Sequence, residues 1–82
     1  RAQARQATAP LRKAIQQAER EMEKLGAERD RLPAELAAPE TYNGPADRVA
    51  ALNRKVGEVE QALEAAESRW MEASEALEEA IG

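Results

Sequence analysis

Four cations in the first half of the chain recur at intervals of seven, four and seven residues: Lys13, Arg20, Lys24 and Arg31. On one helix this spacing places them in a single row, here called the stripe. A row of cations that faces away from a helix's packing side suits a phosphate backbone, which is held by charge without base reading. The alternative is a solvated helix surface, in which neighbouring acids partly offset the stripe (Glu21, Glu28 and Glu35).

Two further residues are candidates for contact with nucleic acid. Arg54 is expected to point outward near a predicted turn. Tyr42, the only tyrosine, lies in that turn, and an exposed aromatic at a tip can stack on a base. More often such a residue packs over the loop and covers the last hydrophobic layer.

The absent residue types argue against catalysis. The 82 residues include no Cys and no His, so thiolate and imidazole chemistry and the usual zinc ligands are missing. The four glycines are too scattered for a phosphate-binding loop. Carboxylates on exposed helix faces are not shielded from water as a catalytic pair is. We therefore expect no catalytic, metal or cofactor site in this chain, and no membrane span.

The composition predicts long helices. Aromatic residues make up 2% and charged residues 34%, which suits a narrow buried stripe better than a three-dimensional core. Two unbroken heptad seams, with Arg29 as the one polar exception, carry the apolar residues. The first comprises Leu11, Ile15, Ala18, Met22, Leu25, Arg29, Leu32 and Leu36. The second comprises Val49, Leu52, Val56, Val59, Leu63, Ala66, Trp70, Ala73, Leu77 and Ala80.

A turn between the seams predicts an antiparallel hairpin. Residues 39–45 (PETYNGP) hold two prolines and Asn-Gly, and a connection this short forces two helices to run antiparallel. Pairing the seams across the turn gives residue numbers that sum to 84 or 85, as for Ile15 with Trp70. The predicted fold is all-α, an antiparallel two-helix coiled-coil hairpin over residues 10–82. Its helices span about 10–38 and about 45–80, and its turn spans 39–44.

In this register the positions beside the two seams predict three further contacts. Facing g-type positions pair opposite charges, at Glu35 with Arg48 and at Glu28 with Lys55, which makes these two cations poorer candidates for nucleic acid. Glu19 would face Glu67, a like-charge contact with no evident reason. Arg29 is expected either to fix the register or to lay its stem along Val56 with its head turned outward.

The prolines bear on the helix ends. Thr8 is a plausible N-cap, with Pro10 in the first turn of helix 1. Residues 1–9 would then be the end of a linker, frayed or helical. Pro33 lies inside the first seam, where a kink or a local end is expected. Pro45 fits the first turn of the second helix.

The stretches PLRKAIQQAEREMEKL (Pro10 to Leu25) and RWMEASEALEEA (Arg69 to Ala80) resemble a known module. They are similar to the C-terminal extension of bacterial ABC-F ATPases, most of all the YheS branch and more distantly the Uup branch. The resemblance spans nearly the whole chain and includes the Pro-Glu-Thr-Tyr turn. Pro33 departs from the YheS pattern, in which this stretch is more continuously helical.

The resemblance implies a function for the parent protein. Such proteins are soluble and cytoplasmic, carry two ATP-binding cassettes upstream, and act on ribosomes or, in the Uup branch, bind DNA through this extension. Here it implies a non-catalytic, monomeric arm that contacts ribosomal RNA, tRNA or DNA, with ATP bound only upstream. Two alternatives remain: a structural or protein-interaction coiled coil, and the similar tRNA-binding arm of a valyl-tRNA synthetase.

Overall fold

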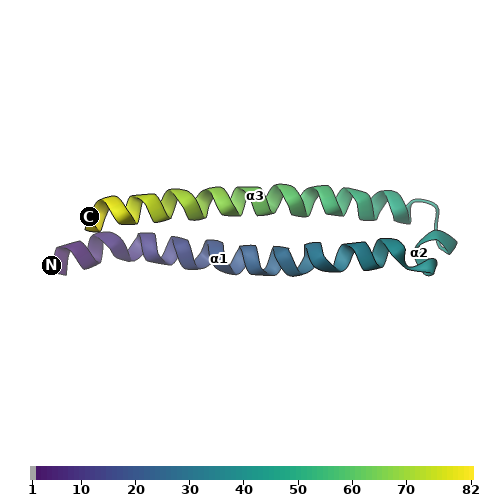
Figure 1. The fold of residues 1–82 in the computed structure, drawn as a ribbon, viewed down its shortest axis with the longest axis horizontal. Helices are drawn as coiled ribbons and strands as arrows, with labels where there is room; N and C mark the ends of the chain where they lie inside the picture. The colour runs from purple at the N-terminus through teal and green to yellow at the C-terminus, as the bar shows by residue number, and fades with distance from the viewer. Residues whose placement is uncertain (1) are drawn as a thin grey trace.

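The computed structural model describes residues 2–82, and their side chains from Gln6 onward. Two long helices, α1 (Ala2–Ala37) and α3 (Arg48–Ile81), are joined by a short helix, α2 (Pro39–Asn43). The long helices lie side by side and antiparallel, so the start of α1 and the end of α3 lie at one end of the molecule and α2 forms the tip (Figure 1). The molecule measures 62 × 15 × 14 Å. The predicted all-α helical hairpin is confirmed.

The turn follows from its prolines. A residue before proline is pushed out of the α region, and Ala38 is accordingly extended (φ −66°, ψ 133°), which ends α1. Pro39 opens α2, where its missing N–H costs no hydrogen bond. Thr41 then folds back: its N–H donates to the Ala38 carbonyl and its hydroxyl to the Glu35 carbonyl. The predicted turn, residues 39–44, falls between α1 and α3, but the sequence pattern does not reveal the helix inside it.

The two seams meet as predicted. Every seam residue is buried or half-buried except Arg29 and Ala80. The core cluster of Leu32, Val59 and Leu63 is joined by four half-buried residues: Met22, Leu25, Leu52 and Val56. It therefore contains both members of three expected pairs, which confirms the register in the middle of the hairpin. Arg29 turns its guanidinium outward to Asp30 (Nε to Oδ1, 3.3 Å), so its head lies at the surface.

The N-terminal end of α1 corrects two expectations. Thr8 is not an N-cap, and Pro10 is not in a first turn, because α1 begins at Ala2 and both residues lie inside it. Thr8 is instead 1% exposed. Its number and that of Leu77 sum to 85, so it continues the seam beyond Leu11. Of the region expected to be a frayed or helical linker end, residues 2–9 are helical, while residue 1 lies outside the described residues.

Of the two outcomes expected at Pro33, a kink or a local end, the local end is wrong, and Pro45 also lies elsewhere than expected. α1 does not end at Pro33 but continues to Ala37, although proline removes one helical hydrogen bond. Leu32, immediately before it, is 5% exposed in the core cluster, and this burial offsets the cost of the proline. Pro45 lies before α3 rather than in its first turn, since α3 begins at Arg48.

Candidate nucleic-acid interface

The stripe lies on the outer face of α1. Its four cations are all exposed. They occupy the c and f columns of the heptad, which point away from α3, and no acid interrupts these columns between Lys13 and Arg31. At about 1.5 Å per residue the stripe extends roughly 27 Å along the helix. Among the side chains of residues 6–82, none of the four cations makes an ion pair or a hydrogen bond.

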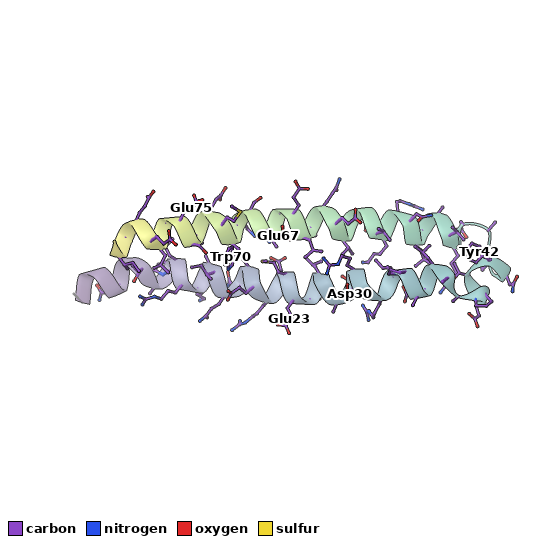
Figure 2. All side chains as sticks on the ribbon, in the orientation of Figure 1. Glu23, Asp30, Tyr42, Glu67, Trp70 and Glu75 are labelled. Atoms are coloured by element: carbon purple, nitrogen blue, oxygen red, sulfur yellow. The ribbon has the colours of Figure 1, made fainter. Side chains whose placement is uncertain are left out.

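Acids border the stripe on both sides, and most of them are engaged. On the side toward α3, Glu28 pairs with Lys55 (Oε1 to Nζ, 3.4 Å), which confirms that predicted contact. Glu21 on the same side pairs with Arg69. On the other side, Asp30 is held by Arg29. Glu23 is exposed on the outer side of α1 and has no such partner in the described part of the chain (Figure 2).

The Glu21–Arg69 pair was missed by sequence reasoning. In this register the residue directly across from Glu21 is Ala62, because their numbers sum to 83, as those of Glu28 and Lys55 do. Arg69 lies seven residues further along α3 and reaches Glu21 diagonally with its long side chain. Direct pairing rules therefore do not find it. The predicted pair of Glu35 with Arg48 is wrong, because no ion pair joins them within residues 6–82.

Glu19, the acid that was expected to face Glu67, has a neutral partner in Trp70. The Trp70 indole N–H donates to the Glu19 carboxylate (Nε1 to Oε2, 3.1 Å), so a neutral donor contacts one of the two acids. Ile15, the predicted neighbour of Trp70, lies one helical turn before Glu19. Figure 2 shows Trp70 between the long helices. This hydrogen bond joins α1 and α3 near the open end of the hairpin and so helps to fix their register.

Arg54 and Tyr42 are not brought to the stripe. Arg54 is exposed on the outer side of α3, between seam residues Leu52 and Val56, and so faces the opposite way. Tyr42 lies at the tip, 64% exposed (Figure 2). The packed arrangement considered for Tyr42 is wrong, because its neighbour Thr41, at 2% exposed, fills that place instead. A single straight phosphate backbone along α1 could not contact Arg54.

The part of the chain that the structure describes lacks three other features that could indicate a function. No pocket opens there. No group of three acidic, histidine or cysteine side chains is close enough to hold a metal ion. None of the described helices has the length and apolarity needed to cross a membrane.

Comparison with known families assigns the hairpin to a domain family. Residues 7–81 match the family model described as the ABC transporter C-terminal domain. The chain belongs to this family. No curated protein and no solved structure matches the chain. The match covers α3, the tip and all but the first residues of α1, so the whole stripe lies within the matched region of the ABC transporter C-terminal domain.

Proposed function

We propose that this domain is a non-catalytic arm of a soluble, cytoplasmic ABC-F ATPase, and that it binds the phosphate backbone of RNA or DNA through the stripe. The family match places the hairpin at the C-terminal part of an ABC protein and favours that parent over a valyl-tRNA synthetase. ATP would bind in the cassettes of that parent, upstream of this chain. The target would be ribosomal RNA or tRNA on the ribosome, or duplex DNA.

One observation carries the proposal: the four cations of the stripe are free, while Glu21 and Glu28, the two acids within reach of Lys24, are held by α3. Exposed cations on a helix carrying this many carboxylates would ordinarily pair with acids three or four residues away. Here Glu21 and Glu28 are bound to α3. Glu23 and Glu35, the remaining acids at these spacings, make no ion pair with the stripe in the described part of the chain. The stripe therefore presents unneutralised charge on a face that packs against nothing else in the described chain. Binding of this kind is sequence-independent and falls steeply with salt.

The experiment replaces all four stripe residues with Gln and titrates RNA and DNA duplexes at two salt concentrations, with chemical shifts of the domain as readout. Four phosphate contacts give a log–log salt slope of roughly −3.6 on B-form DNA, and the variant should lose most of it. Circular dichroism should show unchanged helix. Unchanged affinity in a folded variant would refute the proposal.

A matched pair of single variants separates the stripe from overall charge. Lys24→Gln and Arg54→Gln each remove one exposed cation, from opposite sides of the hairpin. If binding used the stripe, Lys24→Gln would weaken it more and would reduce the salt slope by about 0.9. If binding followed net charge alone, the two variants would weaken it equally.

The tip makes a separate contribution to the proposal. Tyr42 is exposed on a short helix that Thr41 anchors to the end of α1. An aromatic ring held in this way can stack on an unpaired base, a contact worth about 1–3 kcal/mol. Tyr42→Ala should therefore weaken binding to a single strand and leave duplex binding unchanged. Equal effects on both would show that the ring does not stack.

A protein partner is the second candidate function, and the open end of the hairpin favours it. Met71 and Ile81 are 54% and 62% exposed, although both are large and apolar. A protein interface depends on such residues more than on salt. The isolated domain is expected to be a monomer, which sedimentation can check. If Met71→Ser abolished binding of this domain to the parent's cassettes at high salt, the result would favour a protein partner over nucleic acid.

A further inference from the structure

We infer that Lys55 and Arg69 of α3 are positioning residues that keep the stripe open to phosphates. The inference rests on the proposed function. These two cations do not themselves touch the nucleic acid. They act through Glu28 and Glu21, the two acids of α1 that lie three or four residues from Lys24.

Glu28 is the first of the competing acids. It lies four residues after Lys24 and three before Arg31, the two spacings at which side chains meet on a helix surface. Either cation of the stripe is therefore a natural partner for it. In the structure its Oε1 instead lies 3.4 Å from Lys55 Nζ, and the side chain is only 25% exposed. Lys24 and Arg31 are left exposed without a carboxylate partner among the described side chains.

Glu21 repeats the arrangement one heptad earlier. It lies three residues before Lys24, so Lys24 has an acid within reach on either side of it along α1. Arg69 of α3 holds Glu21 in an ion pair. Both of the intrahelical competitors of Lys24 are thus held by the opposite helix. This makes Lys24 the stripe residue that depends most on α3.

The positions of Lys55 and Arg69 argue against direct contact with the same backbone. Both lie at g-type positions beside the helix–helix seam, whereas the stripe lies on the side of α1 that points away from α3. Loss of Lys55 would free Glu28 to pair with Lys24 or Arg31. An incoming phosphate would then have to displace a carboxylate and would meet one more uncompensated negative charge.

A double-mutant cycle between Glu28 and Lys55 tests the inference. Affinity of the 82-residue chain for a fluorescein-labelled RNA duplex, and for a DNA duplex of the same sequence, is measured by anisotropy at low salt. Lys55→Gln should weaken binding about twofold more in the native background than in the Glu28→Gln background, as expected for one surface ion pair. An equal loss in both backgrounds would overturn the inference, because it would mean that Lys55 acts directly.

Three controls complete the test. Lys55→Arg keeps the ion pair and should restore native affinity. The exchange Glu28→Lys with Lys55→Glu keeps the pair and the net charge; it should bind at least as well as the native chain, whereas direct contact by Lys55 predicts a loss. Circular dichroism should show equal helix content throughout. The cycle of Glu21 with Arg69 should give the same coupling, with Arg69→Lys as its rescue.

The failure of this inference can be told apart from failure of the proposed function by including Lys24→Gln. If Lys24→Gln weakens binding but neither cycle shows coupling, α3 does not position the stripe and only this inference falls. If Lys24→Gln leaves affinity unchanged, the stripe is not the binding surface and both proposals fall.

Discussion

Replacing Gly57 with Ala should stabilise the hairpin. Gly57 is exposed in the middle of α3, and a Cβ built on it would meet no atom within 4 Å. No glycine of the described chain has a positive φ, so the native backbone there suits any residue. Alanine would therefore gain its full advantage in helix propensity, about 0.8–1.0 kcal/mol over glycine in a helix interior.

The size of the effect makes it easy to measure. No hydrophobic burial accompanies the change, because the new methyl group points into solvent, so helix propensity is the whole contribution. For a domain of this size, about 1 kcal/mol raises the thermal midpoint by about 4–8 °C. Thermal and urea unfolding followed by circular dichroism should report the gain, with an unchanged urea m-value because the exposed surface on unfolding is the same.

Gly44 supplies a control of opposite sign. A Cβ on Gly44, at the end of α2, would lie 2.9 Å from the Glu40 carbonyl oxygen, which belongs to the backbone and cannot simply rotate away. Gly44→Ala should therefore destabilise the hairpin, by about 1–3 kcal/mol. If Gly57→Ala failed to raise the midpoint, or if both variants moved it in the same direction, the assigned surroundings of these glycines would be wrong.

Two other predictions concern the seam. Leu63→Ala removes a core side chain that is 7% exposed and should lower the free energy of unfolding by about 2–5 kcal/mol, seen as a lower urea midpoint, whereas the exposed neighbour Glu64→Ala should have little effect. Trp70→Phe keeps an aromatic ring but removes the N–H that Glu19 accepts. It should cost about 1 kcal/mol, and equal thermal midpoints for native and variant chains would contradict the role given to this hydrogen bond.

The fold could be predicted because a two-helix hairpin is specified by periodicity. Two seams and one proline-rich turn determine the pairing, and the register appears as a constant sum of residue numbers. What periodicity could not supply was the behaviour of single prolines. Pro10 and Pro33 are tolerated inside α1 because the seam buries Thr8 and Leu32 beside them. Whether such burial outweighs a lost hydrogen bond depends on contacts across the seam, not on local sequence.

The stripe itself could be predicted because the side of a helix on which a residue lies follows from its position in the heptad. Which partners the acids around the stripe choose could not be predicted. Glu28 with Lys55 obeys the direct pairing of facing positions and was found. Glu21 with Arg69 and Glu19 with Trp70 are diagonal contacts of long side chains. They depend on rotamers, and several partners are within reach of each group, so spacing alone leaves the choice open.

A chain with a net charge of −4 can still attract a phosphate backbone where free cations lie together, as the four cations of the stripe do along the outer side of α1. The outer face of α3 carries six exposed carboxylates: Glu58, Glu64, Glu72, Glu75, Glu78 and Glu79. The hairpin is 14–15 Å thick, whereas charges in water are screened beyond about 8 Å at physiological ionic strength. A phosphate bound against the outer side of α1 is therefore separated from those acids by more than one screening length.

At about 0.01 M salt the screening length grows to roughly 30 Å, which exceeds the thickness of the hairpin. The acids of α3 then repel a phosphate bound to α1. The charge that governs binding is consequently local: the stripe, the unpaired Glu23 and Glu35 beside it, and the acids that Lys55 and Arg69 hold away from it.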